Sequence, residues 1–307
     1  MSQDRVVVVG DALIDELRDD LGLREFVGGA ALNVAVGLSR LGVPTSLIAM
    51  VGDDAAGERI AAYLADFDVE LIPSPSPQGS SRAVSVRSRG GEPTYEFNAA
   101  AQARRVVFGE RERWAIAAAP VTVVSCFPLD DAAQTQDLVD AVAATDTRLV
   151  IDPNPRTGMM HDLEAFVAAF ERLVPRAAVV KVGDDDAALM YSEELDDAVA
   201  RVRALGAPVV LATRGAAGAG MTGEGFDVSS PVATLRGRIV DTMGAGDASL
   251  AAIVAALVRD QPPADGPGWQ EVLDEAMEIA AATCRFEGAL LRTASELRDV
   301  DIDSIGT

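Results

Sequence analysis

Lysine and histidine are nearly absent from this chain of 307 residues. Lys181 is the only lysine and is followed by Val182, whereas a Walker-type phosphate loop requires a lysine followed by serine or threonine. His161 is the only histidine and precedes Asp162, so the His-Arg-Asp signature of protein kinases is missing. A single histidine also excludes a zinc site built on histidine pairs. We interpret His161 as an exposed residue at the start of a helix.

Cysteines and long apolar runs are also scarce. Cys126 and Cys284 are far apart in the sequence, a pattern typical of a reduced protein of the cytosol, although two cysteines could still form a disulfide. The longest helix-like apolar stretch, Leu250 to Val258, is much shorter than the ~20 residues of a membrane span. The first residues run directly into a strand-like segment and lack the pattern of a signal peptide. We therefore expect a soluble, cytoplasmic protein with no membrane partner.

Positive charge is the third scarcity. The chain has 26 basic and 48 acidic residues, which gives a formal net charge of −22. Such a charge argues against a surface that binds the phosphates of DNA or RNA. With 49% apolar and 24% charged residues, the composition is that of a globular protein. The length suits one large α/β domain, or a domain with a small appendage, and we expect a single domain over residues 1–307.

Short β-branched runs alternate with alanine-rich segments of helical period along most of the chain. This alternation predicts a mostly parallel central sheet flanked by helices. The expected strands are Val6–Val9, Ser46–Val51, Val121–Cys126, Arg148–Ile151, Ala178–Val182 and Val209–Thr213. The expected helices are Asn33–Leu41, Gly57–Phe67, 130–143, 162–173, 194–205 and Leu250–Val258.

Two segments, at about 12–28 and 68–98, interrupt this alternation of strands and helices. Neither has a convincing helical pattern, and residues 82–98 alternate in polarity around Gly90-Gly91, which is a hairpin signal. The proline-rich stretch Pro73–Pro77 reads as a stiff, extended connector. We expect these segments to form a small β-sheet that stands off the main sheet as a lid.

The sequence Asp241-Thr242-Met243-Gly244-Ala245-Gly246-Asp247 precedes an apolar helix. Two glycines around a small residue allow the backbone to approach a ligand closely, and the N–H groups at a helix start attract an anion without any basic side chain. A carboxylate at the mouth of such a site, Asp247, suits a general base that faces a phosphoryl group in transfer.

This motif resembles the carboxy-terminal signature of the ribokinase, or phosphofructokinase-B, family of sugar kinases. Further resemblances follow in family order and cover nearly the whole chain. They are Gly28–Ala35 ending in Leu41-Gly42, Gly52–Gly57, Thr213–Gly218 and Gly288-Ala289. The resemblance implies a ribokinase-like α/β fold, a small β lid through which two copies form a homodimer, and an ATP-dependent kinase with a small sugar as its other substrate.

The resemblance also implies roles for individual residues. Asp247 would take the proton from the sugar hydroxyl, and the backbone of Gly244, Ala245, Gly246 and Asp247 would form an anion hole for the γ-phosphate. The implied sugar-binding residues are Asp15, Gly28, Gly29, Asn33 and Arg156. The implied ATP-binding residues are Thr213, Gly215, Gly218 and Asp186, with the helix Met277–Phe286 facing adenine. Asp186 would help to hold Mg²⁺, and Asp241 would lie at a site for a monovalent cation, K⁺.

Some positions depart from the family pattern. The family commonly has Asn-x-x-Glu where this chain has Gly183 and Asp186, and proline where it has Ala294. These departures bear on the handling of Mg²⁺ and K⁺ respectively. The motifs Gly10–Asp15 and Asp152–Arg156 are similar to those of the bacterial fructokinase branch, which makes fructose the first substrate candidate and 2-keto-3-deoxygluconate its nearest rival.

Other activities stay open as alternatives. The chain could be another sugar or nucleoside kinase of the same family, or a catalytically silent relative that binds sugar or nucleotide as a sensor. A dinucleotide-dependent oxidoreductase is disfavoured because Gly10-Asp11-Ala12 follows the first strand in place of Gly-x-Gly-x-x-Gly. A Schiff-base enzyme would require Lys181, and we expect Lys181→Arg to stay active.

Overall fold

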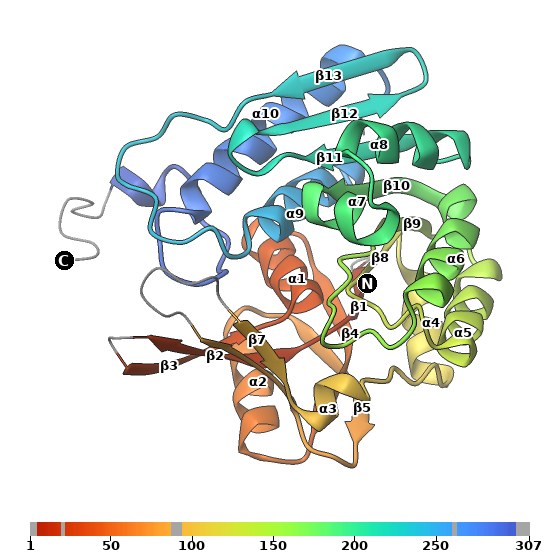
Figure 1. Ribbon diagram of the computed structural model, residues 1–307, viewed down its shortest axis with the longest axis vertical. Coiled ribbons are helices and arrows are strands. Elements are labelled where there is room, and N and C mark those ends of the chain that lie inside the picture. The colour runs from red at the N-terminus through yellow and green to blue at the C-terminus, as the bar shows by residue number, and fades with distance from the viewer. Residues whose placement is uncertain (1–4, 20–21, 87–93, 260–262, 299–307) are drawn as a thin grey trace.

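A computed structural model describes residues 5–19, 22–86, 94–259 and 263–298. Within these residues the chain forms two β-sheets with helices around the larger one (Figure 1). The predicted hairpin at Gly90-Gly91 lies outside the described residues.

The larger sheet has nine strands, parallel except for an antiparallel hairpin at one edge. In spatial order the strands are β13 (Phe226–Ser230), β12 (Ala219–Gly223), β11 (Val209–Thr213), β10 (Ala177–Gly183), β9 (Arg148–Asp152), β8 (Val121–Ser125), β1 (Val6–Gly10), β4 (Thr45–Gly52) and β5 (Glu70–Ser76). This arrangement confirms the expected α/β class and the six predicted strands.

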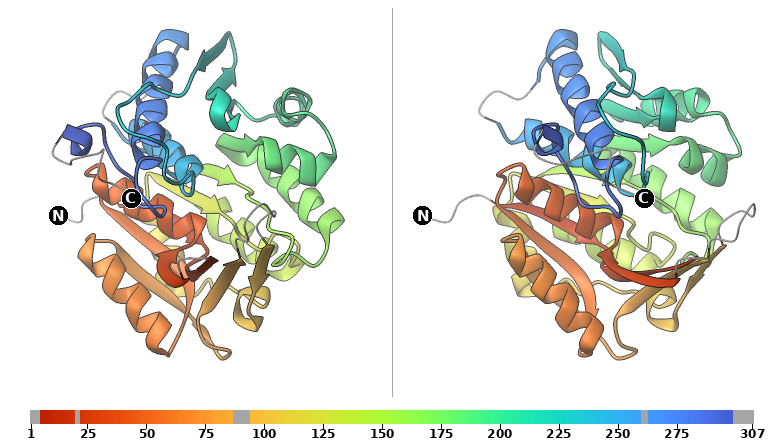
Figure 2. Two further views of the ribbon diagram at one scale, coloured as in Figure 1. Left: turned by 60° about the vertical axis from the view of Figure 1, so that its left-hand side comes forward. Right: turned by 90° about the vertical axis from the view of Figure 1, so that its left-hand side faces the viewer.

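Helices cover both faces of this sheet, and the buried strand β1 shows why (Figure 2). Val6 and Val8 point into one apolar cluster and Val7 and Val9 into the other, since successive side chains of a strand alternate between faces. The first cluster is covered by α1 (Ala30–Arg40), α2 (Ala55–Asp66), α9 (Ala245–Leu257) and α10 (Gly266–Thr283). The second is covered by α4 (Glu110–Ala118), α5 (Ala132–Ala143), α6 (Leu163–Leu173), α7 (Asp184–Tyr191) and α8 (Leu195–Ala204).

The smaller sheet lies beside α2 and confirms that the two irregular segments form strands of their own. Its order is β3 (Gly22–Gly28), β2 (Leu13–Asp19), β6 (Ser81–Val86) and β7 (Thr94–Phe97), followed by the short helix α3 (Ala99–Gln102). Arg59 on α2 contacts Glu25 on β3 at 2.7 Å, which ties the small sheet to the body of the protein, and Arg82 on β6 contacts the same carboxylate at 2.7 Å within the small sheet.

The predicted boundary of the second segment, 68, was wrong. β5 belongs to the edge of the large sheet, where it pairs in parallel with β4. Pro73 and Pro75 are tolerated there because an edge strand has one side without a hydrogen-bonding neighbour, so prolines on that strand need not interrupt the ladder. The stretch interpreted as a connector is therefore mostly strand.

Two helix boundaries also differ from expectation. α1 begins at Ala30 and not at Asn33, because the distant side chain of Asp11 accepts a hydrogen bond from the Ala31 N–H at 2.9 Å and satisfies the first turn. α10 begins at Gly266, well before the predicted start at Met277, and ends at Thr283, before the predicted end at Phe286. Within the described residues, no helix is both long and apolar enough to cross a membrane.

Candidate active site

The candidate site lies where the carboxyl ends of the parallel strands meet. Gly10, Ser125 and Asp152 are in register at the ends of β1, β8 and β9, and Gly183 pairs with Thr213 at the ends of β10 and β11. In open α/β sheets this edge is the usual place for ligands. Residues that are far apart in the sequence are thereby brought together.

The first turn of α9 forms one wall of the site. Gly244 precedes the helix with φ +76°, a left-handed conformation that side chains disfavour. A Cβ at this position would lie 2.6 Å from the Cβ of Ala289, so the turn packs directly on the Gly288-Ala289 loop. Asp241 joins the same loops, because its carboxylate accepts from the N–H of Met243 and of Gly288 at 3.1 and 3.3 Å. The two predicted motifs thus form one unit.

Asp247 lies in that first turn and meets α1 across the site. The Asn33 amide donates a hydrogen bond of 2.8 Å to its Oδ2 atom. Burial raises the pKa of Asp247 to about 7; the Asn33 hydrogen bond and the charges of Lys181 and Arg156 act in the opposite direction. A carboxylate of this kind is well matched to accept a proton near neutral pH.

A second carboxylate with a raised pKa comes from the small sheet. Burial, together with the charges of Asp11 and Asp247, raises the pKa of Asp15 to about 7. A Cβ on Gly28 would lie 2.2 Å from Asp15 Oδ2, so glycine is required beside this side chain. Gly29 has φ +112° and lies against the backbone of Asp11, which completes the turn into α1.

Arg156 is the cation that faces these acids. It follows β9 and is exposed. Partial loss of water around its guanidinium group would lower the pKa of Arg156, but neighbouring acidic groups, Asp247 and Asp11 among them, outweigh this effect and raise it. The Arg156 carbonyl accepts from the N–H groups of Met159 and Met160 at 2.8 and 3.0 Å. Among the described residues the guanidinium group has no ion-pair or hydrogen-bond partner, so its donors are available to a ligand.

The predicted nucleotide residues lie along β10, β11 and the following turn. A Cβ on Gly183 would be 3.0 Å from Thr213 Oγ1, so the asparagine common in the family would require Thr213 to shift. Gly218 has φ +96° and packs against the carbonyl of Ser230, whereas Gly215 has open space around it. Asp186, in the first turn of α7, accepts from the Gly183 N–H at 2.7 Å through Oδ2.

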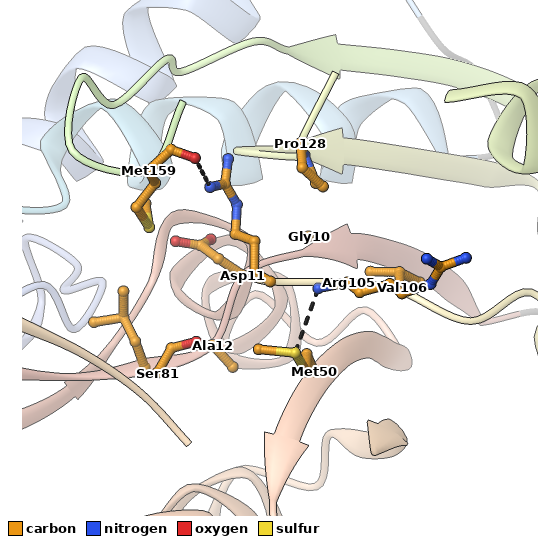
Figure 3. Close-up of a pocket in the computed structure, with 11 residues that line it drawn as sticks. Gly10, Asp11, Ala12, Met50, Ser81, Arg105, Val106, Pro128 and Met159 are labelled. Atoms are coloured by element: carbon orange, nitrogen blue, oxygen red, sulfur yellow. Dashed lines mark hydrogen bonds between the residues drawn. The ribbon is translucent and has the colours of Figure 1, made fainter. Parts of the chain in front are cut away.

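A small cavity of about 10 Å³ is lined by Asp11 and its neighbours Gly10 and Ala12, among other residues (Figure 3). It has room for about one water molecule and none for a sugar. Arg104, which lines the cavity, donates to the Met159 carbonyl at 2.7 Å, and the Arg105 N–H contacts Met50 Sδ at 3.3 Å.

Not all of the charged residues at the candidate site were identified from the sequence. Lys181 was considered only as a Schiff-base residue, yet its ammonium group forms a buried ion pair of 2.8 Å with Asp152. Ser125 donates to the other oxygen of Asp152 at 3.1 Å. The signal was present in the sequence, since a chain with one lysine places it within an otherwise apolar strand. His161, by contrast, is exposed just before α6, as predicted.

Comparison with known proteins agrees with this geometry. Residues 3–293 match the pfkB family carbohydrate kinase, and the chain belongs to this family of sugar kinases. Among the relatives, the fructokinase of Rhizobium leguminosarum bv. trifolii is 31% identical over 268 residues, which cover 83% of this chain and 80% of that protein.

Solved structures show the same fold. The fructokinase of Xylella fastidiosa with bound ATP superposes with a TM-score of 0.82 at 20% identity and covers 97% of this chain and 98% of that one. A fructokinase of Vibrio cholerae O395 with fructose, ADP and a potassium ion gives 0.79 at 20% identity, covering 94% and 95%. The ribokinase-like fold expected from the motifs is thereby confirmed.

Proposed function

We propose that this sugar kinase is fructokinase-like: it transfers the γ-phosphoryl group of ATP to a hydroxyl of fructose, with Asp247 as general base. The observation that carries the proposal is the Asn33–Asp247 hydrogen bond, which fixes a carboxylate of raised pKa at the amino end of α9. The sugar O–H bond breaks with its proton passing to Asp247. The sugar oxygen bonds to phosphorus as the bond to the ADP oxygen breaks.

The backbone of the same turn would stabilise the negative charge of the phosphoryl group during its transfer. The N–H groups of Gly244, Ala245, Gly246 and Asp247 lie at or near the start of α9, at the positive end of the helix dipole. The Ala245 N–H also donates to the Thr242 carbonyl at 3.3 Å. Arg156 adds a guanidinium group, whose planar donors suit phosphate oxygens. Asp15, Gly28, Gly29 and Asn33 would bind the sugar hydroxyls on the opposite side, since carboxylate and amide groups suit a polyol.

ATP would lie along Thr213, Gly215 and Gly218. Mg²⁺ would enter with the nucleotide and neutralise charge on its phosphates. Among the described residues no group of three or more His, Cys, Asp or Glu side chains could hold a metal alone. Asp186 fits a supporting role, because Oδ2 is bound to Gly183 while Oδ1 remains for a water of hydrated Mg²⁺.

Two further features belong to this proposal. The small sheet acts as a lid over the sugar, and a second copy of the chain joins through it. A potassium ion, like the one in the Vibrio cholerae structure, would bind near the Asp241 and Gly288 loops. Sedimentation of the intact chain tests the dimer, and activity in potassium against sodium chloride tests the cation.

A coupled ADP-release assay over a sugar panel tests the function. The panel includes fructose, ribose, 2-keto-3-deoxygluconate and a nucleoside. We expect fructose to give the highest kcat/KM, and Asp247→Asn to lower kcat by roughly 10²- to 10⁴-fold. Near-normal kcat in that variant would contradict the mechanism. Stabilisation of the wild type by ATP and sugar without turnover would favour a sensor instead.

The pH profile gives a second test. Because the base must be deprotonated, kcat/KM should fall as the pH drops through about 7, the pKa to which burial raises Asp247. A profile flat from pH 8 to pH 5 would contradict Asp247 as the base.

A further inference from the structure

Lys181 has an environment that a purely structural ion pair does not explain. Its side chain is 7% exposed, and that of its partner Asp152 is 0% exposed. Burial by itself would lower the pKa of Lys181, but the charges of Asp152 and Asp186 outweigh it and raise the pKa, so the ammonium group stays protonated. A permanent positive charge therefore lies inside the sheet edge that carries the site.

This charge lies directly below the first turn of α9. A Cβ on Gly246 would be 3.5 Å from the Cε atom and 3.8 Å from the Nζ atom of Lys181. Glycine at this position thus leaves the helix start in close contact with the lysine. The next residue, Asp247, is close enough for the charges of both Lys181 and Asp152 to act on it.

The donors of the ammonium group are not all used. It carries three N–H groups, and within the described part of the chain its hydrogen bond is the one to Asp152. Buried donors without partners cost free energy, so stability alone would favour an apolar residue on this strand. The arrangement is better explained by an effect on the adjacent site.

We propose that Lys181 is a positioning residue of the phosphoryl-transfer site: held by Asp152, it presents a fixed positive charge to Asp247 and to the amino-terminal turn of α9. The role rests on the proposed function, because Asp247 is the base whose charge it supports. Lys181 acts through Asp247 and need not touch the sugar.

The pair should act on Asp247 with opposite signs. Lys181 favours the ionised carboxylate and Asp152 opposes it, since unlike charges attract and like charges repel. Every other element around Asp247 is unchanged by substitutions at these two positions. The polar and charged groups that face it from those elements are Asn33 from α1, Asp15 from β2 and Arg156 from the loop after β9.

The decisive comparison uses three full-length variants: Lys181→Met, Asp152→Asn and the double variant. Asp152→Asn and the double variant both lack the buried carboxylate and differ only in the lysine charge. Lys181→Met alone leaves the buried carboxylate of Asp152 without its cation. Even if that variant fails to fold, Asp152→Asn and the double variant can still be compared. Ser125→Ala is the matched control, because it removes the other hydrogen bond to Asp152 and leaves both charges in place.

The Asp247 carboxyl is titrated by NMR on ¹³C-aspartate-labelled protein and assigned by the signal missing in Asp247→Asn. We expect Lys181→Met to titrate at higher pH than the wild type and Asp152→Asn at lower pH. The double variant should titrate at least 0.5 pH unit above Asp152→Asn, and Ser125→Ala should match the wild type. Equal midpoints in Asp152→Asn and the double variant would overturn the proposal.

Kinetics on the best sugar give the second readout. The acidic limb of kcat/KM should shift in the same order as the NMR midpoints, while Lys181→Arg should keep the wild-type limb because it keeps the charge. Unfolding midpoints separate stability from function: the double variant should recover stability relative to Lys181→Met without recovering the wild-type kcat. Full recovery of kcat would overturn the role. Because the NMR titration needs no turnover, absence of sugar phosphorylation would count against the proposed function alone.

Discussion

Two carboxylates of this molecule, Asp54 and Asp247, each lie at the start of a helix and yet have opposite environments. Asp54 caps α2 and accepts three hydrogen bonds of 2.7–2.8 Å, one from the Gly57 N–H and two from Ser80. These bonds, the Ser80 hydroxyl first, lower the pKa of Asp54. Asp247 accepts one side-chain hydrogen bond, from Asn33, and burial raises its pKa to about 7.

The comparison distinguishes a carboxylate whose charge is stabilised by the fold from one whose charge the fold destabilises. Asp54 fixes the entry to β6 and α2, and its charge is fully compensated by local donors. Asp247 is held beside other acids, including Asp152 and Asp15, in a place where its charge is disfavoured. Retaining an acid there is costly for stability and useful for proton transfer.

Moving Asp247 without changing it gives the largest effect expected from this comparison. Gly244→Ala forces a side chain into φ +76° and within 2.6 Å of Ala289, so the turn that carries Asp247 must shift. A displacement of about 1 Å lowers kcat by roughly 100-fold. Steady-state kinetics and unfolding midpoints check this.

Gly225→Ala is the matched control. Gly225 also has φ +76°, but nothing lies within 4 Å of its Cβ position, in the turn between β12 and β13. This variant should lose about 1–2 kcal/mol of stability from the left-handed conformation and keep its kcat. Equal losses of kcat in the two variants would show that strain, and not the position of Asp247, determines activity.

Asp15 offers the next test, on the side of the site that we propose binds the sugar. Asp15→Asn removes a charged acceptor, so the KM for the best sugar should rise about 10- to 100-fold. Glu16→Gln is the neighbouring control: it lies on the opposite face of β2, where Glu16 contacts Arg18 and Arg82. A rise in KM of the same size in both variants would place the sugar elsewhere, and the KM for ATP should change in neither.

The parts of the fold that follow from local pattern were predictable from the sequence. Continuous apolar runs such as Val6–Val9 gave the strands, and Gly42 marked the end of α1. Boundaries set by distant residues were not predictable in this way. α1 starts earlier than expected because Asp11, about twenty residues before it, satisfies its first turn. β5 was not predicted as a strand, because its prolines suit only an edge strand.

The site shows the same division. Asp247 and its glycines stand in one continuous motif, so the sequence was sufficient to single them out. The ion pair of Lys181 and Asp152 depends on the adjacency of β9 and β10, two strands separated by a helix and a loop. Local pattern cannot show that two such residues are in contact. A lone lysine in a buried strand does, however, indicate that the lysine needs a partner of opposite charge.

The smallest expected effect concerns stability against pH, and its sign differs between the two carboxylates. Asp247 has its folded-state pKa raised above the usual 3.8, so the native state loses stability as the pH rises from about 4 through about 7. Asp247→Asn abolishes this loss and should be more stable than the wild type at pH 8. A shift of three pKa units would give about 4 kcal/mol for a fully buried group, and the partial exposure of Asp247 reduces this to about 1–2 kcal/mol.

Asp54 should behave in the opposite way. Its pKa is lowered in the folded state, so its contribution is present above about pH 4 and is lost as the pH falls through the folded-state value. Asp54→Asn should therefore be about 1 kcal/mol less stable than the wild type at pH 8, with the deficit shrinking toward pH 3. Urea unfolding at pH 5 and pH 8 measures both variants against the wild type. The gain of Asp247→Asn should grow between these pH values while the deficit of Asp54→Asn persists, and parallel changes in the two variants would show that the two carboxylates do not differ in kind.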